Sequence, residues 1–134
     1  MYDFRIDLVA EWITGKGANT VALQMPEGLK VHAQSIAGEI EERTGVRCVI
    51  VADPCYGACD VDRRFTDYAD VLVQFGHADI PSMHAGPNVL FVEVFMDMDI
   101  SALLPKALPL LKGTVGVLTT VQHVRMLASI TRWL

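Results

Sequence analysis

The chain has 134 residues, of which 51% are hydrophobic and 20% are charged, a composition typical of one globular domain rather than of a disordered segment. The net charge of −5 argues against a general nucleic-acid binder, which usually carries a basic face. No apolar run approaches the roughly 20 residues that a membrane span needs, and the N-terminus lacks the pattern of a signal peptide. We therefore expect a cytoplasmic protein without a nucleic-acid or membrane partner.

The first half of the chain alternates between predicted helices and predicted buried strands. Apolar residues at spacings of three and four predict helices over residues 3–15 and 29–44. Short apolar runs predict strands at 20–25, 47–52 and 70–75.

A short helix is predicted between the last two of these strands. Asp60 or Asp62 is its expected cap, and it carries Phe65 and Tyr68.

The second half of the chain continues the alternation. A strand is predicted at 88–95, an irregular helix with two internal prolines at 101–112, a fifth strand at 114–118 and a final helix after it. Either residues 113–134 open a further domain, or the fifth strand completes the same sheet.

Alternating strands and helices predict right-handed crossovers and a mostly parallel sheet with helices on both faces. The expected fold is thus a three-layer α/β sandwich of the Rossmann-like or flavodoxin-like kind. Because carboxyl ends of parallel strands meet at one edge, the polar residues that follow the strands should converge on one crevice. These residues are Pro26-Glu27-Gly28, the loop from Asp53 to Asp60, Gly76-His77, Asp97 with Asp99, and Gln122-His123.

The three cysteines predict metal binding, catalysis or plain burial rather than disulfides. Cys59 is expected at the start of a helix, where backbone N–H groups stabilise a thiolate, beside the small residues Gly57 and Ala58. A ligand or nucleophile and a buried apolar side chain are equally good interpretations of Cys59. Cys55 would complete only half of a zinc site, and Cys48 lies inside a predicted strand and is expected to fill the core.

The other candidate residues carry weaker signals. Pro26-Glu27-Gly28 opens a helix whose free N–H groups could hold an anion, but it is also a plain turn, and no dinucleotide or P-loop motif is present. His77 and His123 could each donate to a bound group, although loop histidines are often solvated.

Four segments together resemble the diphthamide synthesis protein family, in particular the archaeal 2-(3-amino-3-carboxypropyl)histidine synthase. They are Gln24-Met25-Pro26-Glu27-Gly28-Leu29, Asp53 with Tyr56-Gly57-Ala58-Cys59-Asp60, Gly76-His77 and Thr119-Thr120-Val121-Gln122-His123. The resemblance implies three similar α/β domains, each giving one cysteine to a 4Fe–4S cluster, in a homodimer. It also implies that residues 1–112 are the first domain and that 113–134 are the opening strand and helix of a second, truncated one.

The resemblance further implies the chemistry. S-adenosylmethionine would bind at the cluster and be cleaved reductively to a 3-amino-3-carboxypropyl radical, and that group would be transferred to a histidine of translation elongation factor 2. This is the first step of diphthamide biosynthesis. Cys59 matches the cluster ligand of the first domain, whereas Cys55 matches no ligand. The residues expected near the cofactor are Pro26, Glu27, Gly28, Tyr56, Gly57, His77, Gln122 and His123.

A 4Fe–4S cluster needs several thiolates, so a chain with Cys59 alone is expected to be inactive. Two other functions stay open. The chain could be a non-catalytic α/β module that binds a partner, or a hydrolase with Cys59 as nucleophile and His77 or His123 as base.

Overall fold

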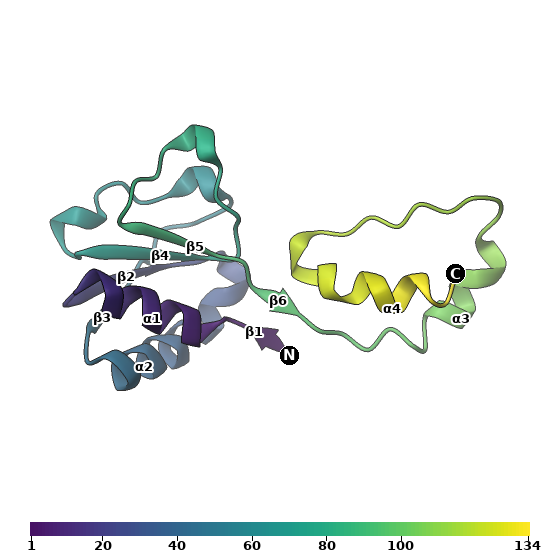
Figure 1. The fold of residues 1–134 in the computed structure, drawn as a ribbon, viewed down its shortest axis with the longest axis horizontal. Coiled ribbons are helices and arrows are strands. Elements are labelled where there is room, and N and C mark those ends of the chain that lie inside the picture. The colour runs from purple at the N-terminus through teal and green to yellow at the C-terminus, as the bar shows by residue number, and fades with distance from the viewer. The chain divides into compact units, whose positions relative to one another are not determined.

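The computed structural model describes residues 1–134 and divides into two compact units (Figure 1). The sheet unit comprises Phe4–Glu93, and the helical unit comprises Met1–Asp3 together with Val94–Leu134. The predicted boundary between residues 112 and 113 stays a prediction.

The sheet unit is built on four parallel strands in the order β3-β2-β4-β5. Their bounds are Thr20–Gln24 for β2, Arg47–Ile50 for β3, Val71–Phe75 for β4 and Val89–Val92 for β5. Numbered along this sheet alone, the order is second, first, third, fourth, as in flavodoxin-like folds. The predicted parallel α/β fold is confirmed, and its topological switch point lies between β2 and β4.

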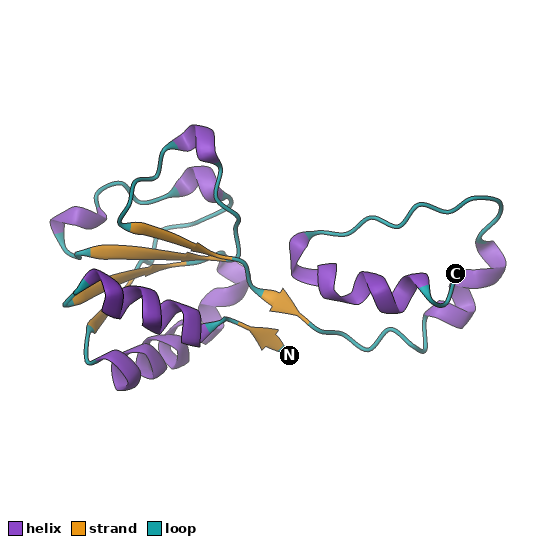
Figure 2. Cartoon of the chain, viewed as in Figure 1, coloured by secondary structure: helices purple, strands orange, loops and turns teal.

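Two helices, α1 (Ile6–Lys16) and α2 (Ala33–Thr44), cover one face of the sheet (Figure 2). The apolar stripe that predicted α2 is buried: Ala33, Ile36, Ala37 and Ile40. The predicted helix 29–44 begins as a 3-10 segment, η1 (Glu27–His32), and ends at Gly45, whose positive φ of 73° lets its N–H bond the Glu41 carbonyl.

The other face is covered by short 3-10 turns, η2 (Ala58–Asp60) and η3 (Phe65–Asp67), and η4 (Pro81–Met83) precedes β5. Phe65 packs with Ala69 on Ala22 and Leu72 of the two central strands. The predicted capping of this segment by Asp60 or Asp62 is wrong: Arg64 is at the N-cap position of η3 and no side chain caps the turn, although Asp62 Oδ1 accepts the Arg64 N–H at 3.0 Å just before it.

The helical unit begins with an antiparallel pair of β1 (Tyr2–Asp3) and β6 (Phe95–Met96). Arg125 holds this pair to the later segments, because its guanidinium pairs with Asp3 at 2.7 Å and lies 3.8 Å from the centre of the Phe95 ring. The helical segments are α3 (Leu104–Ala107), η5 (Leu108–Leu110), η6 (Val121–Met126) and α4 (Leu127–Thr131). None of the helices in the chain is both long and apolar enough to cross a bilayer.

Several predicted elements differ from the structure, among them the helix predicted at 101–112, which is reduced to α3 and η5. The helix predicted at 3–15 starts only at Ile6, since Tyr2 and Asp3 pair with β6. The strand predicted at 88–95 is interrupted, with β5 ending at Val92 and β6 beginning at Phe95. The fifth strand predicted at 114–118 does not form, because no other strand pairs with it and its backbone groups therefore have no ladder partners.

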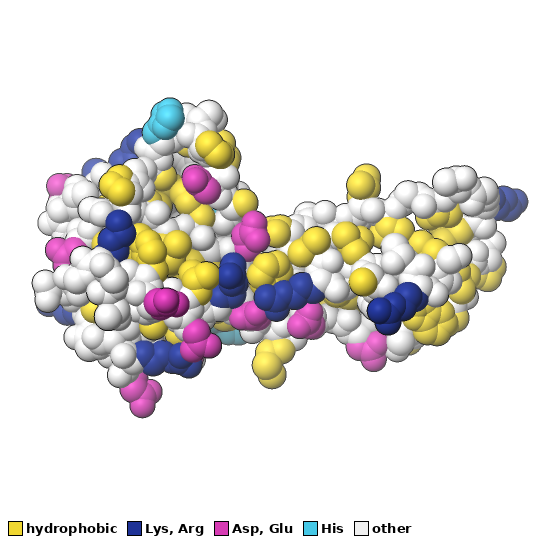
Figure 3. Space-filling model, viewed as in Figure 1, with side chains coloured by type: hydrophobic (Ala, Val, Ile, Leu, Met, Phe, Trp, Pro, Cys, Tyr) yellow, Lys and Arg dark blue, Asp and Glu magenta, His cyan; other side chains and the backbone are white.

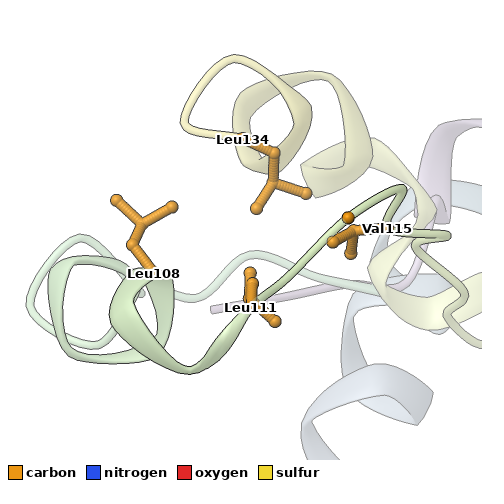
Figure 4. A pocket seen from close by; sticks show the side chains of 5 residues that line it. Leu108, Leu111, Val115 and Leu134 are labelled. Atoms are coloured by element: carbon orange, nitrogen blue, oxygen red, sulfur yellow. The ribbon is translucent and has the colours of Figure 1, made fainter.

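Apolar side chains reach the surface of the helical unit, as the yellow groups in that part of Figure 3 show. Leu118 is 97% exposed, and Leu103 and Leu110 are also largely exposed. An open hollow of about 390 Å³ lies among Leu108, Leu111, Gly113, Val115 and Leu134 (Figure 4). The helical unit thus exposes several large apolar side chains.

Candidate functional site

The loop from Asp53 to Asp60 follows β3 and is anchored at its start by Lys30 of η1. Lys30 Nζ donates to the carbonyls of Ala52 at 2.7 Å and Asp53 at 2.9 Å, and it also pairs with Glu27. The Pro26-Glu27-Gly28 turn after β2 is therefore bonded to the cysteine loop after β3. Sequence reasoning missed Lys30, because nothing local in the sequence marks a lysine that bonds carbonyls 22 and 23 residues further on.

Asp60 closes the loop from its other end. Its carboxylate Oδ2 accepts the N–H groups of Tyr56 at 2.7 Å and Gly57 at 3.0 Å. The Asp60 N–H in turn donates to the Gly57 carbonyl at 3.0 Å. These three bonds fix the backbone on both sides of Cys59.

Cys59 is exposed, and its Sγ lies 3.8 Å from Asp60 Oδ1. A Cβ added at Gly57 would come within 3.3 Å of this sulfur, so the glycine leaves space beside it. The predicted stabilisation by a helix N-terminus is wrong, because Cys59 lies in the three-residue turn η2, which aligns too few peptide dipoles. The capacity of Cys59 to bind a metal therefore rests on its exposure in a fixed loop.

Cys55 is the opposite case, with only 1% of its surface exposed. Its Sγ accepts a hydrogen bond from Gln74 Nε2 at 3.5 Å and lies 3.9 Å from His77 Nδ1. Burial raises the pKa of the Cys55 thiol, and the nearby Asp60 carboxylate raises this pKa further. Cys55 is therefore a buried thiol that contacts Gln74 of β4 and His77.

Gly76 and His77 follow β4. Gly76 has a φ of 84° and lies beside Pro26 and Leu29, and His77 lies beside Cys55. Burial lowers the pKa of His77, and a hydrogen bond with the Tyr56 backbone and the charge of Asp60 offset this only in part. The predicted convergence of polar loops is confirmed for the three loops of the sheet unit.

Two buried glutamines complete the support of the loop. Gln24 and Gln74 are aligned across β2 and β4. Gln24 donates to the Asp60 carbonyl at 2.7 Å and accepts the Asp62 N–H at 3.2 Å, while Gln74 Nε2 donates to the Gly57 carbonyl at 3.3 Å. A signal was present in the sequence, since both apolar strands carry a glutamine two residues before a turn residue, Pro26 or Gly76.

Three predicted site residues remain: Tyr56, Gln122 and His123. Tyr56 is 81% exposed in the cysteine loop. Gln122 and His123 belong to the helical unit, where His123 Nδ1 is 3.3 Å from the Met96 carbonyl oxygen. Because a carbonyl only accepts, a hydrogen bond at this contact requires Nδ1 of His123 to be the donor.

The donor set fits one ligand of an iron–sulfur cluster. No group of three or more histidine, cysteine, aspartate or glutamate side chains in residues 1–134 is arranged to hold a metal ion. Cys59 offers one exposed thiol, whereas Cys55 is committed to the interior. A 4Fe–4S cluster therefore fits here only with further thiolates from outside these residues.

Known proteins resemble this chain at the level of sequence. The sequence pattern of the diphthamide synthesis protein family matches residues 25–134. The chain is 40% identical over 105 residues to 2-(3-amino-3-carboxypropyl)histidine synthase subunit 1 of Gallus gallus, which covers 74% of this chain and 25% of that protein. It is 32% identical over 122 residues to the subunit 1 of Encephalitozoon cuniculi, covering 90% of this chain and 35% of that one.

The fold resembles that of solved structures. The crystal structure of Dph2 from Pyrococcus horikoshii with a 4Fe-4S cluster aligns with 99% of this chain and 41% of its own, with a TM-score of 0.79 and 26% identity. The chain thus spans well under half the length of the relatives that it matches. The matched segment includes the Pro26-Glu27-Gly28 turn, the cysteine loop and the Gly76-His77 turn. The chain belongs to the diphthamide synthesis protein family.

Proposed function

We propose that this chain supplies Cys59 as one thiolate ligand of a 4Fe–4S cluster. The observation that carries the proposal is the pairing of an exposed Cys59 with a loop backbone held on both sides by Asp60. A solved relative of the same fold is described with a 4Fe-4S cluster. Cys55 and Cys48 are not proposed as ligands, since Cys55 is buried and Cys48 lies in β3.

The proposed activity of the complete protein is that of a 3-amino-3-carboxypropyl transferase. Relatives are named 2-(3-amino-3-carboxypropyl)histidine synthase. The group would come from S-adenosylmethionine and be added to a histidine of translation elongation factor 2. When bound, the cluster would supply the electron for reductive cleavage of the cofactor. These residues alone are expected to be inactive, because one thiolate cannot hold the cluster.

The proposal includes the domain organisation. Residues 1–112 would form the first of three similar α/β domains and 113–134 the opening of the second, in a homodimer. The missing thiolates would come from the other domains. This arrangement would account for the absence of a compact cysteine motif in the sequence.

The residues around Cys59 would bind and orient the cofactor. Gly57 leaves space beside the sulfur, and Pro26, Glu27 and Gly28 begin the η1 segment at the carboxyl end of β2. His77, held neutral by burial at pH 7, would offer one donor and one acceptor. Tyr56, Gln122 and His123 are proposed as further cofactor contacts.

The test is reconstitution of the complete protein that carries this sequence with iron and sulfide under anaerobic conditions. Bound iron, the visible absorption of the cluster and release of methylthioadenosine from S-adenosylmethionine are measured for Cys59→Ala and for the matched control Cys48→Ala. We expect Cys59→Ala to lose all three signals and Cys48→Ala to keep them. Iron content and methylthioadenosine release that do not change in Cys59→Ala would remove Cys59 from the cluster.

A second candidate function is a non-catalytic module that binds a partner protein. The exposed leucines of the helical unit, together with the leucine and valine side chains that line the hollow in Figure 4, favour it, since exposed apolar side chains often mark an interaction site. A protein that elutes with a partner and holds no iron after reconstitution would support this candidate. Iron bound through Cys59 would exclude the module without a cluster.

A further inference from the structure

We propose that Gln24 and Gln74 are positioning residues that hold the Cys59 loop in its ligand-bearing conformation before any metal binds, at the expense of sheet stability. The inference rests on the proposed role of Cys59 as a cluster ligand. It concerns two residues that lie inside the sheet and not on its open edge.

The two side chains are unusual for their position. Both lie in central parallel strands, where side chains are normally apolar because both faces of the sheet are covered. Gln24 is 1% exposed and Gln74 is 0% exposed. Their neighbours in the chain are buried and apolar: Ala22 and Leu23 of β2 with Met25 directly after it, and Leu72, Val73 and Phe75 of β4.

The hydrogen bonds of this pair flank Cys59 on both sides. On the N-terminal side, Gln74 Nε2 donates to the Gly57 carbonyl at 3.3 Å. On the C-terminal side, Gln24 bonds the Asp60 carbonyl at 2.7 Å and the Asp62 N–H at 3.2 Å. The two amides are themselves joined, because Gln74 Nε2 lies 3.4 Å from Gln24 Oε1. The loop is thus fixed to the sheet at both ends of η2.

This arrangement leaves one buried acceptor without a partner, Gln74 Oε1. Turning the amide over would not relieve it, because the oxygen would then face two other acceptors, the Gly57 carbonyl and Gln24 Oε1. Gln24 cannot turn to compensate, since Asp60 requires a donor and Asp62 an acceptor. An unpaired buried acceptor lowers stability, so an apolar side chain of similar shape at position 74 would suit the fold better.

Replacement of Gln74 also leaves no backbone group of the loop without a partner. The Gly57 carbonyl that Gln74 bonds already accepts the Asp60 N–H at 3.0 Å. The amide of Gln74 is therefore not needed to satisfy the fold. Its other bonds are to Gln24, which keeps its bonds to Asp60 and Asp62, and to Cys55 Sγ, a weak acceptor. The main effect of the Gln74 amide is therefore to restrain the position of the loop, and this separates a positioning role from a structural one.

The experiment compares Gln74→Met and Gln24→Met in the complete protein that carries this sequence. The matched control is Gln34→Met, a substitution at an exposed site on α2. For the metal-free protein, thermal unfolding and hydrogen exchange of the amides of residues 56–62 are measured. For the reconstituted protein, the rate of iron loss to a chelator is measured.

We expect Gln74→Met to unfold at the same or a higher temperature, while its loop amides exchange faster and iron is lost about tenfold faster, the lower end of the effect seen when a residue that supports a metal ligand is removed. Gln24→Met should show a larger increase in exchange and a lower unfolding temperature, since it leaves Asp60 and Asp62 without their partners. Unchanged exchange in Gln74→Met, or a lower unfolding temperature of that variant, would overturn the proposal.

The same measurements separate this inference from the proposed function. If Gln74→Met accelerates loop exchange but Cys59→Ala keeps its iron, the glutamines position the loop and the assignment of Cys59 as a ligand fails. If Cys59→Ala loses iron and Gln74→Met exchanges like the natural chain, the ligand assignment stands and the positioning role fails.

Discussion

Gly76 and Pro26 are in direct contact at the carboxyl edge of the sheet. A Cβ added at Gly76 would lie 3.2 Å from Cδ and Cγ of Pro26, and the glycine has a φ of 84°. The positive φ and the tight space both favour glycine at this position. The contact joins the turn after β4 to the turn after β2 across the switch point of the sheet.

We expect Gly76→Ala to lower the free energy of unfolding by about 1–3 kcal/mol, because it combines a disfavoured positive φ with a steric overlap. Chemical unfolding followed by circular dichroism measures this. The matched control is Gly38→Ala in the middle of α2, where no atom lies within 4 Å of the added Cβ. Helix propensity should make the control more stable by about 0.5–1 kcal/mol. Equal effects of the two substitutions would contradict the role of Gly76.

Lys30→Met should destabilise the start of the cysteine loop. The substitution removes the donors to the Ala52 and Asp53 carbonyls, and hydrogen bonds to charged groups contribute about 1.5–3 kcal/mol each at most. We expect a loss of about 1–2 kcal/mol in the free energy of unfolding, since water can reach part of this site. Lys112→Met, at an exposed position of the helical unit, is the control and should change stability by less than about 0.5 kcal/mol.

The three thiols should differ in their reaction with iodoacetamide. The thiolate is the reacting form, and burial with the charge of Glu41 raises the pKa of Cys48 to about 12, so its thiolate fraction at pH 8 is on the order of one in ten thousand. Burial also raises the pKa of Cys55 and covers its sulfur. In the metal-free native protein, peptide mass spectrometry should find Cys59 labelled first. Cys48 is only half-buried, so its predicted place in the core is wrong, and labelling of Cys48 at the rate of Cys59 would contradict its raised pKa.

Stability should fall in mild acid because of His77. Its pKa is lower in the folded protein than in the unfolded chain, chiefly through burial, so the unfolded state binds more protons below about pH 6.5. The contribution is fully present above that pH and is lost as the pH decreases. Unfolding at pH 7.5 and 5.5 measures it, and the difference between the two should be smaller in His77→Gln. His84→Gln, at an exposed loop position, is the control and should retain the natural pH dependence.

Local patterns in the sequence predicted most of the sheet unit. The strands β2, β3 and β4 and the helix α2 were predicted to within a few residues. The spacing of apolar residues that reveals them is visible in a short stretch of sequence. The same reasoning failed at residues 114–118. An apolar run there resembles a strand, but a strand exists only where another strand pairs with it, and periodicity does not report pairing.

The candidate site was predicted in outline from its motifs. The Pro26-Glu27-Gly28 turn, the cysteine loop and the Gly76-His77 turn each follow a strand, and parallel topology brings them to one edge. The residues that hold the site were not predicted. Lys30, Gln24 and Gln74 belong to elements that sequence reasoning treated as parts of a helix and of two buried strands.

For this protein, the sequence by itself determined the parallel α/β class, the family and the set of loops that contain the candidate residues. Only the tertiary structure decided that Cys59 is exposed and Cys55 is buried, and that Gln24 bonds both Gln74 and Asp60. These partners lie 50 and 36 residues from Gln24 in the chain. The physical reason is that burial periodicity is local, whereas a hydrogen bond depends on the position of both its groups. Those positions are set only when β2, β3 and β4 pair in register.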